Sequence, residues 1–436
     1  MKIRIKGHIP IFSLILCAFV LAFNLKTAQK QENQKEIQEK AIAINIEVPT
    51  RVYDGNKFVD NLTIEDFELY EDRVLQDIDA VYLIKERTIK RKESVDKEEI
   101  IKEEDTEKKF APKEPRHFFL VFELLDYTPQ IKEIADYFFQ NVIQPEDTLQ
   151  VITPVKTYRL KAESFKIKTK EDMGKALWSI VKKDVGIGNS EYRNLMEEMK
   201  KIVRAMGIFL AAPGANILDA FGNSMYTSDS YDDLKLLLPA YETNLIRLEQ
   251  IRGVDQKGLM DFGASLEGIE GQKIVFLLYQ REYIPQIDLK ALPQISDLMQ
   301  DDPAAYMALQ NITGLYARGS CLDVDRVKKA YADASISAHF MFLTKIAETL
   351  PGITMQESSS DIFGAFKSLA DATGGTVDSS SSPEHLFEKA VEASENYYLL
   401  YYTPKNYVAD GKFKKIEVRV KGKNYRVTHR AGYIAD

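Results

Sequence analysis

Hydrophobic residues recur along this chain with two different periods, and each period predicts a different kind of element. Near the amino terminus, Ile42, Ile44, Ile46 and Val48 alternate with less apolar positions, which predicts a strand with one buried face. Over residues 116–395 the pattern changes to short apolar runs separated by longer segments with helical spacing. After residue 396 the two-residue period returns, most clearly over 413–420. The pattern therefore predicts an α/β region between two β-rich ends.

The middle region predicts a doubly wound α/β fold with a mostly parallel sheet, because its strands alternate with helices. Buried strands are expected at 118–122, 273–279 and 336–343, and helices at 131–142, 170–183, 191–209, 231–251, 323–334, 360–372 and 383–394. Two or three C-terminal strands do not form a stable sheet alone. We therefore expect them to pack with residues 41–84 in a β-sandwich-like companion domain.

Changes in composition give the expected domain boundaries. Residues 85–115 are mostly charged with balanced signs, and such a segment cannot bury a core. The predicted organisation is a signal peptide (1–28), a polar spacer (29–40), an N-terminal β segment (41–84), a charged linker (85–115), an α/β domain with a helical insertion around 186–244 (116–395), and a C-terminal β segment (396–436).

The first residues have the features of an export signal. Lys2, Arg4 and Lys6 precede an apolar stretch over 9–23, which is shorter than the roughly 20 residues that a spanning helix needs. We expect an exported protein, periplasmic or extracellular, with an uncleaved N-terminal membrane anchor as the alternative. Cys321 is then the one cysteine left, so no intramolecular disulfide is expected. We interpret Cys321 as a small buried thiol rather than a nucleophile.

The overall charge argues against a nucleic-acid partner. The chain has a formal net charge of −8, with acidic and basic residues mixed along it, and 45% of its residues are hydrophobic. Nucleic-acid binding needs a concentrated basic face. We therefore expect a globular protein whose partner, if any, is another protein.

Several short segments follow one another in an order that suggests a family. They are Val-Tyr-Asp-Gly at 52–55, Leu-Thr-Ile-Glu-Asp-Phe-Glu-Leu-Tyr-Glu-Asp at 62–72, Arg-His-Phe-Phe-Leu-Val-Phe-Glu at 116–123, Gly-Gln-Lys-Ile-Val-Phe-Leu at 271–277, Leu-Ala-Asp-Ala-Thr-Gly-Gly at 369–375, Tyr-Leu-Leu-Tyr-Tyr-Thr-Pro at 398–404, Asp-Gly-Lys-Phe-Lys-Lys-Ile at 410–416 and Arg-Ala-Gly-Tyr at 430–433. In order and spacing the chain resembles the bacterial von Willebrand factor A (VWFA)-related proteins of the acidobacterial type. The resemblance implies a VWFA-like α/β domain and says little about function, because one fold serves many functions.

The same resemblance implies a degenerate metal-ion-dependent adhesion site. Metal-binding members carry Asp-x-Ser-x-Ser after the first strand, where carboxylate and hydroxyl oxygens hold Mg²⁺. In this chain Glu123, Leu125 and Tyr127 occupy those positions, and Gln280-Arg281-Glu282 follows the second central strand, where an Asp is usual. We therefore expect neither a metal ion nor another cofactor.

Asp126 and Thr128 offer a displaced carboxylate and hydroxyl, so weak cation binding there is the alternative. Mg²⁺ demands near-ideal octahedral geometry, which a displaced pair does not supply. We prefer the interpretation that these two side chains cap the helix beginning near Pro129.

The expected function is protein binding without metal, in an adhesion-type or envelope role, by a non-enzymatic module. In open α/β sheets the binding face lies at the carboxyl ends of the strands, which gives a candidate partner-binding face of Asp126, Tyr127, Thr128, Gln280, Glu282 and Tyr283. A structural component of an envelope assembly is the first alternative. A hydrolase is a weaker one, because no nucleophile elbow, P-loop or His-Glu-x-x-His motif is present. His339 lies in an apolar run and is interpreted as a core histidine.

Overall fold

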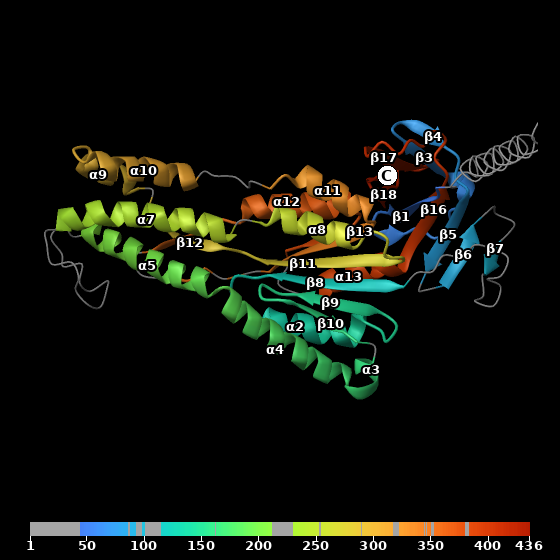
Figure 1. Ribbon diagram of the computed structural model, residues 1–436, viewed down its shortest axis with the longest axis horizontal. Coiled ribbons are helices and arrows are strands. Elements are labelled where there is room, and N and C mark those ends of the chain that lie inside the picture. Colours follow the sequence, from blue (N-terminus) through green and yellow to red (C-terminus); the bar gives the residue numbers. More distant parts are fainter. Residues whose placement is uncertain are drawn as a thin grey trace, which may run out of the picture. The chain divides into compact units, whose positions relative to one another are not determined.

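Six strands form the central sheet, and the strand at one edge runs against its neighbour. In the computed structural model the strand order is β10-β9-β8-β11-β13-β15 (Figure 1). These strands are β8 (Arg116–Glu123), β9 (Thr148–Ile152), β10 (Thr157–Leu160), β11 (Gln272–Gln280), β13 (Ile336–Leu343) and β15 (Val377–Asp378). The pairs β8–β9, β8–β11, β11–β13 and β13–β15 are parallel, whereas β9–β10 is antiparallel.

The structure describes a defined part of the chain, namely residues 44–85, 88–92, 98–100, 115–161, 163–211, 230–252, 254–288, 290–316, 322–343, 345, 347–349, 353–379 and 383–436. Residues 47–436 form one compact unit. The predicted signal peptide and polar spacer, Cys321 and residues 101–114 of the predicted linker lie outside the described residues. In the part of the chain that the structure describes, no helix has the length and apolar character needed to cross a membrane.

The predicted fold class, a doubly wound and mostly parallel sheet with a sandwich-like companion, is wrong. The chain is mixed α/β, its central sheet is itself mixed, and several antiparallel sheets accompany it, one of them curled into a half-barrel. The four residues between β9 and β10 explain the mixed sheet, because parallel neighbours need a crossover of a dozen or more residues. A local sequence pattern does not give the direction of a strand relative to its neighbour, so the antiparallel β10 was not predicted.

Helices cover both faces of the central sheet (Figure 1). Side chains such as Phe118 and Phe276 pack with helices on one face, and side chains such as Phe119 and Phe340 pack with helices on the other. The first face is covered by α2 (Gln130–Tyr137), the π-helical turn η3 (Phe138–Val142), α4 (Lys170–Gly188) and α13 (Pro383–Glu395), with the short α3 (Ser164–Ile167) beside them. The second is covered by α8 (Gln256–Ser265), α11 (Val324–Asp333) and α12 (Ser360–Ala372).

Strands from the two ends of the chain pair with each other. One sheet has the order β18-β1-β16-β5-β6-β7 with β2 paired to β1, and another has the order β19-β17-β3-β4. Glu71, in the second sheet, connects the two sheets. Its Oε2 accepts hydrogen bonds from the hydroxyls of Tyr402 in the first sheet (2.7 Å) and Tyr433 in the second (3.0 Å). The strands are β1 (Ile46–Asp54), β2 (Lys57–Phe58), β3 (Phe67–Glu71), β4 (Val74–Gln76), β5 (Ala80–Lys85), β6 (Thr88–Lys92), β7 (Glu98–Ile100), β16 (Asn396–Tyr402), β17 (Phe413–Val420), β18 (Arg426–His429) and β19 (Gly432–Ile434), and the 3₁₀ turn η1 (Ile64–Asp66) precedes β3.

Two segments of the predicted charged linker, β6 and β7, belong to the sheet that contains β1 and β16. β6 pairs antiparallel with both β5 and β7. Charged residues are common in strands at sheet edges, where they discourage pairing with another chain. The charge density of the segment therefore did not exclude strand structure at 88–92 and 98–100.

A second group of elements, which we call the helical arm, continues from the carboxyl ends of β11 and β13. It consists of α5 (Ser190–Ala211), α7 (Ser230–Arg252), β12 (Tyr283–Gln286), α9 (Leu292–Met299), α10 (Pro303–Tyr316) and β14 (Thr354–Glu357) (Figure 1). β12 and β14 pair antiparallel as a separate two-stranded sheet. The arm has its own hydrophobic core, which includes Met199, Leu238 and Ile295. Helices α5 and α7 account for most of the described part of the expanded region around 186–244.

Candidate functional site

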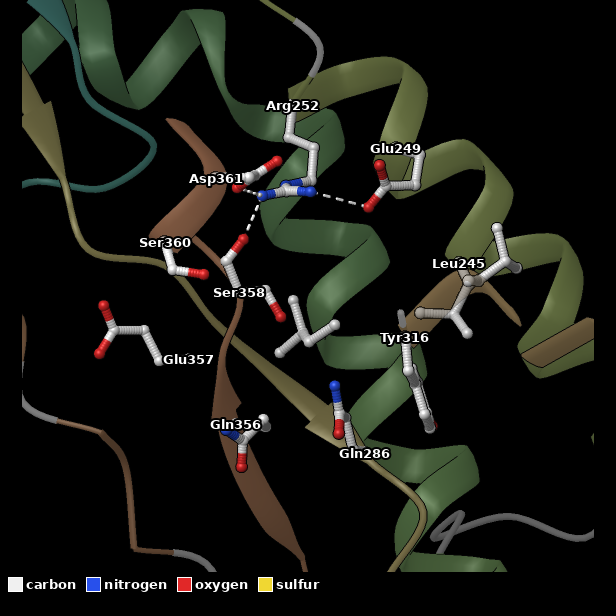
Figure 2. A pocket seen from close by; sticks show the side chains of 12 residues that line it. Leu245, Glu249, Arg252, Gln286, Tyr316, Gln356, Glu357, Ser358, Ser360 and Asp361 are labelled. Atoms are coloured by element: carbon white, nitrogen blue, oxygen red, sulfur yellow. Dashed lines mark hydrogen bonds and ion pairs between the residues drawn. The ribbon is translucent and has the colours of Figure 1, made fainter. Parts of the chain in front are cut away.

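The arm and the start of α12 meet around a cavity of about 320 Å³ with several charged and amide side chains in its lining (Figure 2). Helix α7 delivers Glu249 and Arg252 in its last turn, while the start of α12 delivers Ser360 and Asp361. Strands β12 and β14 add two amide side chains to the lining, those of Gln286 and Gln356, together with the carboxylate of Glu357. We call this cavity the arm cavity.

Arg252 is the centre of the polar network at the arm cavity. Its Nε donates to Glu282 Oε2 (2.7 Å), its Nη1 to Glu249 Oε1 (2.9 Å) and its Nη2 to Asp361 Oδ1 (3.3 Å). Nη2 also donates to the backbone carbonyl of Ser358. Figure 2 shows the guanidinium lying between Glu249, Ser358 and Asp361. One guanidinium thus joins α7, the segment after β11, and the start of α12.

The electrostatics of this network follow from burial. Glu282 has no solvent exposure, so burial raises its pKa, and the neighbouring Arg252 opposes that rise. Burial alone would lower the pKa of Arg252, but Glu282, Glu249 and Asp361 together raise it. One cation faces three carboxylates, so the network has an excess of negative charge when all four groups are ionised.

A second cavity, of about 290 Å³, lies between the end of β8 and the arm. Its lining includes Asp126 and Tyr283, two of the predicted partner-binding residues, together with Tyr192, Lys200 and Lys345. Asp126 Oδ2 is 3.3 Å from Lys345 Nζ, and Lys200 pairs with Glu197 and Glu348 at 2.9 and 2.6 Å. We call this the loop cavity; its charged groups are largely paired within the chain.

The remaining predicted partner-binding residues are partly or fully covered. Gln280 is buried and its Oε1 accepts a hydrogen bond from the Asp126 backbone N–H (3.1 Å). Glu282 and Thr128 are buried as well, whereas Tyr127 is half-buried below Lys182, whose Nζ is 4.9 Å from the ring centroid. The arm covers the strand ends that we expected to be open, so Gln280 and Glu282 position other groups and do not present their own side chains to a partner.

The capping prediction for Asp126 and Thr128 is wrong. The start of α2 has no side-chain cap hydrogen bond, and the N–H of Ile131 donates to the backbone carbonyl of Thr128 (3.1 Å). The Asp126 carboxylate pairs with Lys345 instead, a residue that is 219 positions away in the sequence.

The positions of the degenerate adhesion site do not converge on one point. Glu123 ends β8 with an exposed side chain, whereas Leu125 packs partly against the core of the arm and Tyr127 against the core on the α4 face. Among the described residues, no group of three or more His, Cys, Asp or Glu side chains has an arrangement that could hold a metal ion.

The described histidines lie away from both cavities. His339 is buried in β13, where its Nδ1 lies 2.8 Å from Thr376 Oγ1 and accepts from the Thr376 backbone N–H (3.2 Å). It is therefore a hydrogen-bonded core histidine, as predicted. Among the described residues that line the two cavities there is neither a histidine nor a cysteine.

Sequence reasoning missed Arg252, Glu249 and Asp361. Arg252 ends a helix and Asp361 begins another, positions where a cation and an anion are expected for helix-dipole reasons alone. A signal was nevertheless present, since Glu249 and Arg252 have the spacing of a helical ion pair. Nothing local indicated that Glu282 would complete the network.

Comparisons with known proteins give no relative: no family model matches the chain, and searches of curated proteins and of solved structures found no match.

Proposed function

We propose that this chain is a non-enzymatic binding module that engages a protein partner at the carboxyl end of its central sheet without a bound metal. The observation that carries the proposal is that two predicted acidic site residues already face cations of the same chain. Asp126 pairs with Lys345, and Glu282 pairs with Arg252. Carboxylates neutralised in this way need no metal ion to stabilise them.

The lining of the arm cavity supports a basic side chain as the partner group. Glu249, Glu357 and Asp361 contribute three carboxylates to the lining. Glu249 and Asp361 pair with Arg252, and Glu357 pairs with Arg281 beside the lining (3.2 Å), so with Glu282 four carboxylates face two guanidinium groups and negative charge remains in excess. Gln286, Gln356 and the Ser360 hydroxyl add hydrogen-bond acceptors that can orient a guanidinium or ammonium group. We propose that a lysine or arginine of the partner inserts there.

Location and family membership are part of the same proposal. Export rests on the basic and apolar pattern of residues 2–23, and a role in the cell envelope follows from export. Relationship to the VWFA-related proteins rests on the sequence segments between 52 and 433, and the mixed sheet departs from the fold that we expected from it.

Crosslinking capture from envelope fractions tests the proposal. The full chain is used in chelator and again with added Mg²⁺, beside a Glu357→Gln variant, which removes one cavity carboxylate that is about one-third exposed. We expect the same partner to be captured with and without chelator, and the Glu357→Gln variant to capture several-fold less.

The matched control is Glu267→Gln, an exposed carboxylate between α8 and β11 that lines neither cavity. It should capture as much partner as the wild type. Capture that requires Mg²⁺, or equal losses in the two variants, contradicts metal-free binding at the arm cavity.

A further inference from the structure

The β10 edge of the central sheet carries a concentration of basic residues. Residues 156–170 contain the basic residues Lys156, Arg159, Lys161, Lys166, Lys168 and Lys170, with Glu163 as the one acidic residue, in a chain whose net charge is −8. The first five of these basic side chains are exposed. Among the described residues, no carboxylate pairs with Arg159, Lys161, Lys166 or Lys168.

An apolar groove of about 190 Å³ lies beside this edge. Tyr158 and Leu160 of β10 line it together with Leu177 and Ile180 of α4, and Arg159 and Lys168 are also among its lining residues. It shares no lining residue with the arm cavity or the loop cavity. It is therefore a separate site, with an apolar interior and cations beside it.

The backbone of β10 is open on its outer side. Thr153 N–H donates to the Lys156 carbonyl (3.1 Å), and hydrogen-bonded pairs alternate along an antiparallel ladder. The backbones of Tyr158 and Leu160 therefore face β9, while those of Thr157 and Arg159 face outward. In the described part of the chain, β10 pairs with no strand other than β9.

We propose that this edge binds an extended acidic peptide segment of a partner protein by β-strand addition. The partner's backbone would pair with the outward N–H and C=O groups of Thr157 and Arg159. Alternate apolar side chains of the peptide would enter the groove under α4, and its acidic side chains would face Arg159, Lys161 and Lys168. The complementary charge selects an acidic partner over a neutral one.

An anionic membrane surface is the competing occupant, because Ile167 is 81% exposed between two lysines. A flat membrane would not use the open backbone edge or the groove, however. Those two features favour a peptide over a membrane surface.

Fluorescence anisotropy with the full chain tests this proposal. The probe is a fluorescein-labelled heptapeptide of alternating glutamate and valine, compared with the same composition in block order and with lysine in place of glutamate. We expect binding of the alternating acidic peptide that weakens with salt, and at least about tenfold weaker binding of the other two.

Two kinds of variant separate backbone pairing from charge. Thr157→Pro removes an outward N–H and keeps every charge, and proline is tolerated where an edge strand faces solvent. We expect Thr157→Pro and the charge reversal Arg159→Glu/Lys168→Glu each to weaken binding by about tenfold. Ala176→Phe fills the groove from α4 and serves as the second test if Thr157→Pro lowers the unfolding midpoint. Lys201→Glu, exposed on α5, is the matched control and should bind normally.

Three results would overturn the proposal. The first is normal binding by both Thr157→Pro and Ala176→Phe when only the charge reversal fails, since attachment would then be purely electrostatic. The second is binding to vesicles of phosphatidylglycerol and phosphatidylcholine that competes with the peptide. The third is the absence of peptide binding by the wild type. The three results leave the proposed binding at the arm cavity untouched, because the two sites share no lining residue. Glu357→Gln, which changes only the arm cavity, should therefore bind this peptide normally.

Discussion

The guanidinium of Arg252 and the carboxylate of Glu282 lie 2.7 Å apart, although both belong to segments that the sequence pattern treated as unrelated. Arg252 is the last residue of α7, and Glu282 is the second residue after the end of β11. Their side chains are 7% and 0% exposed, so water does little to screen the pair. The contact attaches the helical arm to the central sheet at the point where the arm cavity begins.

Removal of the Arg252 guanidinium should destabilise the protein strongly. Arg252→Met leaves Glu282 buried without its partner, and breaking one side of a buried ion pair costs about 3–5 kcal/mol. Urea unfolding followed by circular dichroism measures the loss. Adding Glu282→Gln should restore part of the stability because the unpaired charge disappears; no recovery would show that the cost comes from Glu249 and Asp361 instead.

An exposed ion pair on the same helix gives the matched comparison. Arg247 and Glu191 lie 3.1 Å apart with about half or more of each side chain exposed. Exposed pairs contribute about 0–1 kcal/mol, so Arg247→Met should change the unfolding midpoint little. A loss as large as that of Arg252→Met would contradict the importance of burial.

His339 should make the protein less stable in mild acid. Burial, and then the nearby charge of Arg51, lower the pKa of His339 to about 3. An unfolded histidine titrates near 6.5, so between these two values the unfolded chain binds the extra proton. The free energy of unfolding should therefore fall as the pH decreases from about 6.5 towards 3, by up to about 1.4 kcal/mol per pH unit from this residue.

The variant His339→Gln isolates that contribution, since carboxylates also titrate in the same range. A glutamine side chain can still form a hydrogen bond with Thr376 but does not ionise. Urea unfolding at several pH values should show a shallower pH dependence in the variant than in the wild type. Parallel curves would mean that His339 is protonated equally in both states.

Two glycines should respond oppositely to alanine. A Cβ at Gly375 would lie 1.9 Å from the Ala338 carbonyl oxygen of β13, so Gly375→Ala must displace backbone and should prevent stable folding. A Cβ at Gly364 in α12 meets nothing within 4 Å, and alanine favours a helix over glycine by about 0.5–1 kcal/mol. In thermal unfolding, Gly375→Ala should show no cooperative transition, and Gly364→Ala should have a slightly higher midpoint than the wild type. Equal midpoints for the two variants would contradict the close packing of Gly375.

The hydrogen bonds to Glu71 should couple the two ends of the chain. Tyr402→Phe removes one of the two hydroxyls that donate to Glu71 Oε2 in a buried setting, which should cost about 1.5–3 kcal/mol. Tyr407→Phe removes a hydrogen bond to the Asp436 carbonyl at an exposed position and should cost much less. Equal losses in urea unfolding would show that the Glu71 contacts contribute little.

Element positions were largely accessible to sequence reasoning, because they depend on local periodicity. The strand predicted at 336–343 and the helix predicted at 360–372 have those bounds in β13 and α12. Helices at 191–209 and 231–251 are confirmed within α5 and α7. Buried strands and amphipathic helices bury specific faces, and that requirement is visible in one short window of sequence.

The basic edge was overlooked for a different reason. Acidic and basic residues are mixed along the chain as a whole, and the net charge of −8 hides a local excess in residues 156–170. That stretch becomes a surface only when β10 takes the edge of the sheet beside the groove.

The sequence by itself determined where the buried strands 336–343 and 273–279 and several helices around the central sheet form, because these follow local periodicity. It did not reveal β6 and β7 within the charged segment, nor α8, β12, α9, α10 and β14. Only the tertiary structure decided the antiparallel direction of β10, the pairing of β1 with β18, and the meeting of Arg252 with Glu282 and Asp361. The physical reason is range. Periodic burial acts over a few neighbouring residues, whereas these contacts join positions that only the complete path of the backbone brings together, such as Arg252 and Asp361, 109 residues apart.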